Sequence, residues 1–331
     1  MIFCFKYFFK RATFTAAIAL FVLSAHAREE AFDVYVDGLR KEALDKGFPE
    51  QLISHAFKTI ELRKKVIRSD RNQPERKITL TEYLATRVPD WKVAQAVSLL
   101  EEHRDVLDAV EKQYGVQKRF IVALWGNESN FGKLQGKVPV LAALATLAYE
   151  GRREALFRGQ FFDALTILQQ GHVSVEEFKG SWAGAMGQSQ FLPSSFLAYA
   201  VDFDGDGKTN IWSSLPDVFA SIAHYLSSEG WRADQTWGRQ VSLTDPNTTK
   251  LASLSLSERK TLQEWQALGV RRFNGEVLPQ VDMLANLIMP DGPEGRAYLV
   301  YNNFQTLMKW NRSSYFGVSV AYLSERIKKG K

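Results

Sequence analysis

The chain has 331 residues, of which 45% are hydrophobic and 24% charged, with a formal net charge of +5 and one cysteine. This length can bury a large core and indicates two or three domains. Positive and negative residues are scattered along the chain, which argues against a nucleic-acid partner. A single cysteine excludes an intramolecular disulfide and a cysteine-rich zinc site.

The first 27 residues are typical of an export signal. Three positive charges lie within the first eleven residues, an apolar stretch follows over residues 12–24, and a small-x-small sequence ends at Ala27. A membrane anchor is the alternative, but the stretch is shorter than the ~20 residues that span a bilayer. Cleavage after Ala27 is therefore expected, and it leaves 304 residues with a net charge of +2.

Cys4 lies upstream of that apolar stretch. The lipid-bearing cysteine of a lipoprotein follows such a stretch, so Cys4 cannot carry a lipid anchor. The mature chain would contain no cysteine, which excludes thiol chemistry. The sequence therefore predicts an exported, soluble protein rather than a lipoprotein.

Residues 28–115 are predicted to form an N-terminal helical domain, because apolar residues recur at three- and four-residue spacing. The predicted helical segments are Phe32–Lys46, Pro49–Thr59, Leu80–Val88 and Lys92–Tyr114. The basic run at residues 63–65 is more typical of a solvated face than of a binding patch.

Glu128 ends an apolar helical stretch and begins a polar turn. At helical spacing Phe120, Leu124 and Glu128 share one face. Burial disfavours the carboxylate anion and the negative end of the helix dipole disfavours it again, so both effects raise the pKa of Glu128. A raised pKa suits a general acid that works near neutral pH. The alternative is a solvated glutamate in a last helical turn that Gly132 caps.

The segment 180–190 is rich in glycine and in hydrogen-bonding side chains. Its glycines, at positions 180, 184 and 187, would let the backbone approach a ligand closely. Its polar side chains Ser181, Gln188 and Gln190 would offer hydrogen bonds to the same ligand. The alternative is a tight corner at which helices pack.

The segment 202–212 is similar to the start of an EF-hand calcium loop, with acidic residues at loop positions 1, 3 and 5 and glycine at position 6. Ser213 stands where such a loop has its bidentate glutamate, and a later aspartate could close the site. The predicted ligands are Asp202, Asp204, Asp206, Lys208 through its backbone carbonyl, and Asp217. The pattern predicts a stabilising calcium ion, with a metal-free turn as the alternative. No organic cofactor is expected.

From about Gly238 the pattern changes to short alternating stretches, at residues 239–243 and 295–301, separated by turn-forming sequences. This predicts a small α+β unit, followed by a final helix at about residues 304–328. The histidines of the mature chain are isolated in sequence, and neither a Gly-x-Ser-x-Gly elbow nor a P-loop is present. Zinc hydrolase, serine hydrolase and NTPase functions therefore have little support.

Two ordered motifs, Trp125-Gly-Asn-Glu-Ser-Asn-Phe-Gly132 and the segment 180–195, closely resemble those of the membrane-bound lytic transglycosylase B family. The resemblance runs from about Arg71 to beyond Asn311. It implies a mainly α, α+β fold with a lysozyme-like helical core. The implied domains are a signal peptide 1–27, an N-terminal helical domain 28–115, a core 116–236 with its EF-hand-like loop 202–217, a small α+β domain 237–303, and a C-terminal helix 304–331 that packs back on the core.

The resemblance also implies roles for individual residues. Glu128 matches the family's sole catalytic acid/base. The positions that match residues contacting substrate are Ser181, Gln190, Arg152, Arg153, Tyr83, Tyr225 and Asn311. Taken alone, the arginine pair could be a solvated helix face and the tyrosines could be core packing. Trp310 departs from the tyrosine that usually precedes this asparagine in the family.

The function implied is cleavage of the β-1,4 bond between N-acetylmuramic acid and N-acetylglucosamine in peptidoglycan, with formation of 1,6-anhydromuramic acid ends during cell wall turnover. The enzyme would be a lyase, because no water is consumed. The alternatives are a hydrolytic muramidase and a non-catalytic, calcium-stabilised peptidoglycan-binding protein. A monomer is expected, with glycan strands as the ligand and cell-wall synthesis proteins as possible partners.

Overall fold

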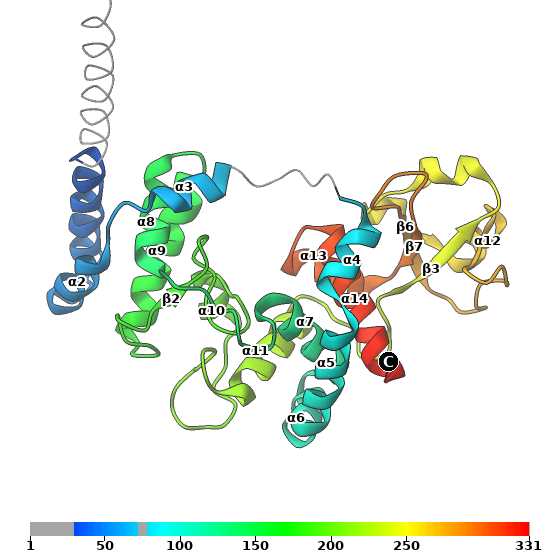
Figure 1. Ribbon diagram of the computed structural model, residues 1–331, viewed down its shortest axis with the longest axis horizontal. Helices are drawn as coiled ribbons and strands as arrows, with labels where there is room; N and C mark the ends of the chain where they lie inside the picture. Colours follow the sequence, from blue (N-terminus) through cyan, green and yellow to red (C-terminus); the bar gives the residue numbers. More distant parts are fainter. Residues whose placement is uncertain (1–29, 72–77, 331) are drawn as a thin grey trace, which may run out of the picture. The chain divides into compact units, whose positions relative to one another are not determined.

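The computed structural model describes residues 30–71 and 78–330, and the predicted export signal lies outside these residues (Figure 1). The chain forms two compact units. The first comprises residues up to 73, with 136–186 and 192–194, and the second comprises residues 74–135, 187–191 and 195–331. The domain boundaries predicted from the sequence remain predictions. Within the described residues, every helix is too short or too polar to cross a membrane.

The first unit is built around two helices, α8 and α9, that pack against each other. Its elements are a helix over residues 30–45, α2 (Glu50–Ala56), η1 (Phe57–Thr59), α3 (Lys64–Arg71), α8 (Val140–Glu150), α9 (Glu154–Gln169), and the antiparallel strands β1 (Val138–Pro139) and β2 (Lys179–Gly180). Residues 140–148 of α8 are all buried. A helix that is apolar all round must lie in a core, which is where α8 lies.

The second unit is centred on helix α7 (Lys118–Ser129), in which nine of twelve residues are buried. α7 packs against α5, α6, α11 and α14. The other α-helices that belong wholly to this unit are α4 (Leu80–Arg87), α5 (Asp90–Glu102), α6 (Arg104–Tyr114), α11 (Leu215–Ser228), α12 (Leu262–Ala267), α13 (Asn302–Trp310) and α14 (Ser314–Lys329). The short α10 (Pro193–Tyr199) begins in the first unit. This packing fixes the C-terminal end of α7, where Glu128 lies.

Two segments predicted as single helices are each broken in the structure. The segment 92–114 divides at His103, which leaves the helical conformation with ψ of 25° and ends α5. The segment 304–328 divides at Asn311, which is extended at φ −146° and ψ 119°. Ser313 then begins α14, because its hydroxyl accepts a hydrogen bond from the Phe316 N–H.

The part of the second unit that follows α11 has α+β structure. It contains a five-stranded antiparallel sheet in the order β4-β6-β7-β3-β5. Its elements are β3 (Gly238–Leu243), η2 (Pro246–Leu251), η3 (Leu256–Glu258), β4 (Lys260–Thr261), α12 (Leu262–Ala267), β5 (Val270–Arg272), β6 (Leu284–Ile288) and β7 (Ala297–Val300). Trp265 of α12 packs into one face with Leu287 and Leu299. The predicted mainly α fold with a small α+β unit is thus confirmed.

Candidate active site

The turn after Glu128 reverses the chain within three residues. Asn130, with φ of 51°, is the left-handed cap of α7, and Phe131 and Gly132 also have positive φ, so the cap is Asn130 and not Gly132. The Phe131 ring folds back over Gly126, where an added Cβ would lie 2.7 Å from the ring. Gly126 is therefore required by packing, and the turn it permits leaves Glu128 at the end of a buried helix.

Glu128 is half-buried, and its Oε1 accepts a hydrogen bond of 2.6 Å from the indole Nε1 of Trp310. Burial raises the pKa of the Glu128 carboxyl to about 7, against opposing effects of the Trp310 hydrogen bond and of the positive charge on Arg87. The raised pKa expected from the sequence is thus found, with desolvation as its main cause. A carboxyl of this pKa can give and take a proton near neutral pH.

An aromatic cluster surrounds Trp310. The ring centroids of Tyr225 and Phe191 lie 4.7 Å and 5.3 Å from that of Trp310, and Tyr199 packs on Tyr225 at 4.6 Å. Burial raises the pKa of Tyr225 to about 12, so this tyrosine stays neutral. The structure therefore brings the predicted Tyr225 next to the indole that contacts Glu128.

The predicted Tyr83 and Asn311 also lie in the second unit. Tyr83 is 4% exposed and packs edge-on against Tyr315, and the Arg87 guanidinium lies 5.7 Å from the Tyr83 ring centroid. Asn311 is exposed, and its side-chain oxygen accepts a hydrogen bond from the Ser313 N–H at 3.1 Å. Tyr83 is thus connected to the surroundings of Glu128 through Arg87, whereas Asn311 follows Trp310 directly.

Gln188 connects three segments that the sequence analysis treated separately. Its Oε1 accepts a hydrogen bond of 2.8 Å from Trp125 Nε1, and its Nε2 donates one of 3.0 Å to the Trp212 carbonyl. The positive φ of Gly132, 80°, favours glycine in this turn, and an added Cβ there would also lie 2.2 Å from Gln188 Oε1. The buried amide thus joins α7, the turn after Glu128 and the end of the acidic loop.

Gln190 has a left-handed backbone, with φ of 51°. Its side-chain Nε2 donates to the carbonyls of Gly187 at 2.8 Å and Gln135 at 3.2 Å. These bonds stabilise the loop around Gln190. Both amide hydrogens of the side chain have backbone acceptors, which leaves its oxygen available to a ligand.

Ser181 lies in the first unit, whereas Glu128 lies in the second. The Ser181 hydroxyl accepts hydrogen bonds from the Ala183 and Ala185 N–H groups at 3.3 Å and 3.1 Å, which closes a turn. Added Cβ atoms at Gly180 and Gly184 would lie 2.3 Å from the Ala185 carbonyl oxygen and 2.5 Å from Leu144. The structure therefore favours the tight-corner explanation for these two glycines.

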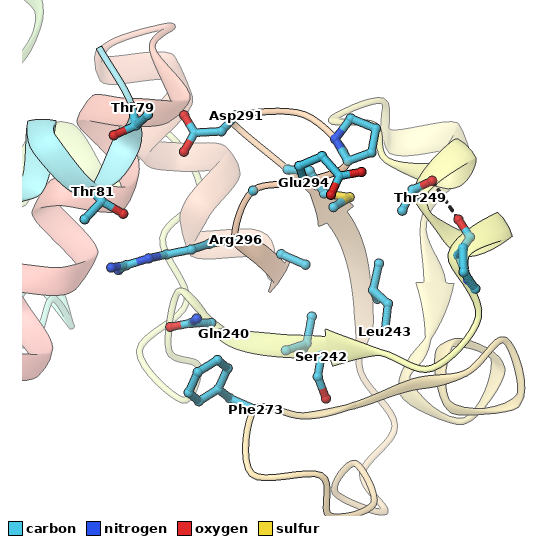
Figure 2. A pocket seen from close by; sticks show the side chains of 16 residues that line it. Thr79, Thr81, Gln240, Ser242, Leu243, Thr249, Phe273, Asp291, Glu294 and Arg296 are labelled. Atoms are coloured by element: carbon cyan, nitrogen blue, oxygen red, sulfur yellow. Dashed lines mark hydrogen bonds between the residues drawn. The ribbon is translucent and has the colours of Figure 1, made fainter.

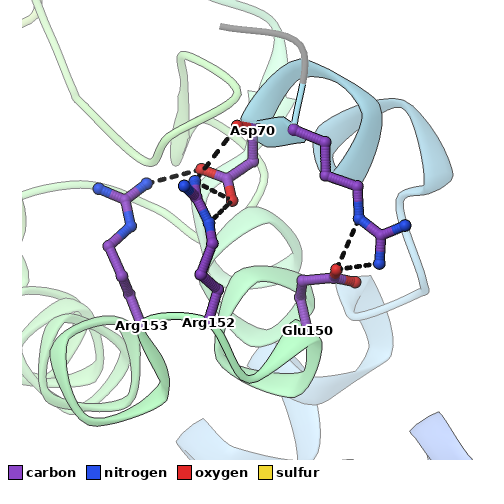
Figure 3. Close-up of polar contacts among 5 residues, drawn as sticks. Asp70, Glu150, Arg152 and Arg153 are labelled. Atoms are coloured by element: carbon purple, nitrogen blue, oxygen red, sulfur yellow. Dashed lines mark hydrogen bonds and ion pairs between the residues drawn. The ribbon is translucent and has the colours of Figure 1, made fainter.

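The arginine pair of the first unit is held by a buried carboxylate, as Figure 3 shows. Asp70 is 3% exposed and forms ion pairs of 2.5 Å with Arg152 and 2.6 Å with Arg153. Burial raises the pKa of Asp70, but the hydrogen bonds from the two guanidinium groups outweigh it and lower the pKa overall. The guanidinium groups are therefore fixed side by side, with their outer N–H groups open to solvent, and they do not form an unordered solvated face.

The acidic loop brings three of the predicted carboxylates together. Asp202, Asp204 and Asp217 each offer an oxygen within 4.8 Å of the others. Asp206 is exposed and outside this group, and its Oδ1 accepts the Lys208 N–H at 2.8 Å. Hard cations such as calcium prefer clustered carboxylate oxygens. The donor set thus fits a cation. The buried Asp217 is the later aspartate that the sequence pattern offered in place of the bidentate glutamate.

A separate cavity of about 1010 Å³ lies beside the five-stranded sheet (Figure 2). The side chains of Gln240, Phe273, Glu294 and Arg296 line it, together with the start of α4. Asp291 closes one side, because its carboxylate accepts the Leu80 N–H at 2.9 Å. Glu128 does not line this cavity.

Three comparisons identify relatives. Residues 31–325 match the family described as transglycosylase SLT domain. The chain is 32% identical over 246 residues to membrane-bound lytic murein transglycosylase B of Escherichia coli (strain K12), covering 72% of this chain and 64% of that protein. The chain thus spans less than two thirds of the length of this curated relative.

Two solved structures are similar over most of the chain. The structure of SltB3 from Pseudomonas aeruginosa in complex with NAG-anhNAM-pentapeptide has a TM-score of 0.86 and 41% identity, covering 91% of this chain and 80% of that one. The Escherichia coli lytic transglycosylase Slt35 in complex with calcium has a TM-score of 0.77 and 26% identity, covering 89% and 93%. The resemblance noted from the motifs is confirmed, and the chain belongs to the transglycosylase SLT domain family, as a relative of lytic murein transglycosylase B.

Proposed function

We propose that this protein is a lytic transglycosylase that cleaves the β-1,4 bond between N-acetylmuramic acid and N-acetylglucosamine in peptidoglycan and leaves 1,6-anhydromuramic acid ends. The observation that carries the proposal is the half-buried Glu128. Its pKa of about 7 suits a group that first donates a proton and then accepts one. The relatives support the substrate class, since SltB3 was solved with NAG-anhNAM-pentapeptide and with NAG-NAM-pentapeptide.

In this mechanism one residue acts twice. Protonated Glu128 gives its proton to the glycosidic oxygen as the bond to muramic C1 breaks, through an oxocarbenium-like transition state. The Glu128 carboxylate then takes the proton of the muramyl 6-hydroxyl, whose oxygen attacks C1. The bond from O6 to C1 replaces the broken bond, the proton returns to Glu128, and no water is consumed.

The electrostatics around Glu128 support a single-carboxylate mechanism. A standard glycosidase has a second carboxylate ~5 to 9.5 Å from the first. Among the residues that the structure describes, Arg87 is the charged group that acts on the pKa of Glu128, and no carboxylate contributes. The arrangement is what an enzyme needs when the substrate's own hydroxyl is the nucleophile.

The remaining positions of the site are assigned to substrate binding. Tyr225 and Asn311 flank Trp310 and would contact the sugars near Glu128, and Gln190 would offer its side-chain oxygen to the glycan. The other assigned residues are Tyr83, Ser181, Arg152 and Arg153. The exposed guanidinium groups held by Asp70 suit a carboxylate of the stem peptide, because arginine binds carboxylates through paired N–H groups.

The first prediction concerns the acid. Glu128→Gln keeps the shape of the side chain and removes the titratable proton, so the rate of glycan cleavage should fall by at least ~10²-fold, the usual contribution of general acid catalysis. The rate is measured by mass spectrometry of products from purified sacculi. Activity within tenfold of the parent protein would place the acid elsewhere.

A stability measurement on the same variant is the control for folding. The pKa of Glu128 is raised from 4.5 to about 7 in the folded protein, so its stabilising contribution is present below pH 4.5 and is lost as the pH rises through 7. Glutamine does not titrate. The variant should therefore gain stability relative to the parent as the pH rises from 4.5 to 8.

The second prediction separates the lyase from the hydrolytic muramidase. When the 6-hydroxyl is the nucleophile, digestion in ¹⁸O-labelled water leaves the new muramic ends unlabelled. Label in most new ends, detected by mass spectrometry, would show that water attacks C1 and that the protein is a muramidase. Sacculi that remain uncut by the purified parent protein would favour the non-catalytic binding protein.

The acidic loop is assigned to calcium. Asp202, Asp204 and Asp217 would hold the ion, which would neutralise carboxylates that otherwise repel one another. Slt35, a solved relative, was crystallised in complex with calcium. The ion would have a structural role, because Glu128 is not a member of this carboxylate group.

The third prediction follows from that assignment. An ion that binds only the folded state stabilises it by ~2.7 kcal/mol at a hundredfold excess over Kd. Calcium should therefore raise the Tm and a chelator should lower it. Asp217→Asn should abolish the response, whereas Asp206→Asn should retain it, because Asp206 lies outside the group. Identical melting curves in calcium and in chelator would show that the loop is a metal-free turn.

The setting of the enzyme is inferred from the same class of substrate. Peptidoglycan is periplasmic, and the first 27 residues of the chain are typical of an export signal. The protein is assigned to the periplasm, as a soluble monomer that acts on glycan strands and could meet cell-wall synthesis proteins there.

A further inference from the structure

Trp310 lies at the end of α13, 182 residues from Glu128 in sequence, and its indole Nε1 is 2.6 Å from Glu128 Oε1. We propose that Trp310 is a positioning residue that fixes which oxygen of Glu128 carries the catalytic proton: Oε1 is held as the acceptor, and Oε2 gives and takes the proton. This inference rests on the proposed function, in which Glu128 is the acid and base.

The chemistry of indole determines which oxygen of Glu128 is the acceptor. An indole N–H can only donate a hydrogen bond, and it has no lone pair available for a proton from the carboxyl group. In a protonated carboxyl, the carbonyl oxygen is the better acceptor. Oε1 is therefore the carbonyl oxygen, and the hydroxyl is on Oε2.

The resemblance to the transglycosylase B family implies a tyrosine at the position of Trp310. A tyrosine hydroxyl both donates and accepts, so a tyrosine in contact with the carboxyl could pair with either protonation pattern of the glutamate. The tryptophan of this chain removes that freedom. The departure noted in the sequence thus has a consequence for the direction of proton transfer.

The surroundings hold the indole in place. Tyr225 packs edge-on against it with ring planes at 68°. The preceding residue, Lys309, donates to the Glu229 carbonyl at 2.8 Å and forms an ion pair of 3.1 Å with the Glu229 carboxylate. The Tyr199 hydroxyl donates to the same carboxylate. The end of α13 is therefore fixed to the end of α11, and the indole N–H is pre-oriented toward Glu128.

The charge balance at Glu128 gives the contact a measurable effect. A hydrogen bond to a carboxylate is stronger than one to a neutral carboxyl. The indole therefore favours the anion and lowers the pKa of Glu128, against the effect of burial. Among the described residues, the charge on Arg87 also favours the anion, and Tyr225, which packs on Trp310, stays neutral. Loss of the indole N–H should therefore raise the pKa of Glu128.

The test uses three variants of the full-length mature protein. Trp310→Phe keeps an aromatic ring and removes the donor. Replacement of Trp310 by benzothienylalanine keeps the shape of tryptophan and exchanges only the N–H for sulfur, so it remains informative should the phenylalanine variant be poorly folded. Trp237→Phe is the matched control, because Trp237 is a buried indole of the same unit that packs on Tyr298 and Phe304.

The Glu128 carboxyl is titrated by ¹³C NMR, with its signal assigned by its absence from Glu128→Gln. The midpoint should rise by about one pH unit in both Trp310 variants, the effect of losing a hydrogen bond to a charged group, and should not change in Trp237→Phe. The cleavage rate should fall ~10- to 10²-fold as the carboxyl loses its orientation. In the parent protein the Trp310 indole ¹H–¹⁵N signal should titrate with the same midpoint, and this titration should vanish in Glu128→Gln.

An unchanged Glu128 midpoint in the benzothienylalanine variant, or an indole signal that does not titrate, would overturn the positioning role. Both measurements are made without substrate, so they hold whatever reaction the protein catalyses. The activity of Glu128→Gln tests the proposed function separately. A normal Trp310 response together with an active Glu128→Gln would refute the role of Glu128 as the acid and leave the contact.

Discussion

The second unit depends on one constraint, which is that the carboxyl group of Glu128 ends a buried helix without becoming fully buried itself. Desolvation raises its pKa, and the Trp310 indole and the positive charge of Arg87 lower it, so that the pKa is about 7. Too much burial would leave a permanently neutral carboxyl, and full exposure would leave a permanent carboxylate. The contacts around α7 maintain a balance between these limits.

Several features of the motif serve that balance. Gly126 gives room for the Phe131 ring, and Gly132 gives room for the Gln188 amide. Gln188 in turn accepts the Trp125 N–H and donates to the Trp212 carbonyl, which lies beside the acidic loop. A cation in that loop would therefore stabilise the same turn that positions Glu128, although it would not touch the substrate. The residues of the motif are explained by packing as much as by contact with a sugar.

The sequence predicts the local features of the fold and of the site well. Glu128 is identified by its place at the end of an apolar stripe, and strands β3 and β7 by their alternation. β6 is not predicted, although residues 285–288 of β6 and 297–300 of β7 are equally buried, so burial does not distinguish these two strands. The helix breaks at His103 and Asn311 are also missed, because short polar interruptions within an apolar period carry little signal.

Long-range contacts are what the sequence does not provide. Trp310 contacts Glu128 across 182 positions, and Asp70 holds an arginine pair 82 and 83 positions away. Asp217 joins Asp202 and Asp204 because α11 begins beside the loop. Each of these residues is an ordinary polar or aromatic residue in the sequence, and each acquires its role from packing. For Trp310, the available signal is its departure from the family motif.

The central claim is that Glu128 acts as an acid whose pKa is close to 7. The most direct test is the pH dependence of kcat/KM on a soluble glycan substrate, which reports the ionisation of groups in the free enzyme. Because the protonated form donates to the glycosidic oxygen, kcat/KM should be constant below pH 7 and should fall tenfold per pH unit above it, with a midpoint at about 7. A midpoint near the ordinary glutamate value of about 4.3, or a profile that stays flat to pH 9, would contradict the account.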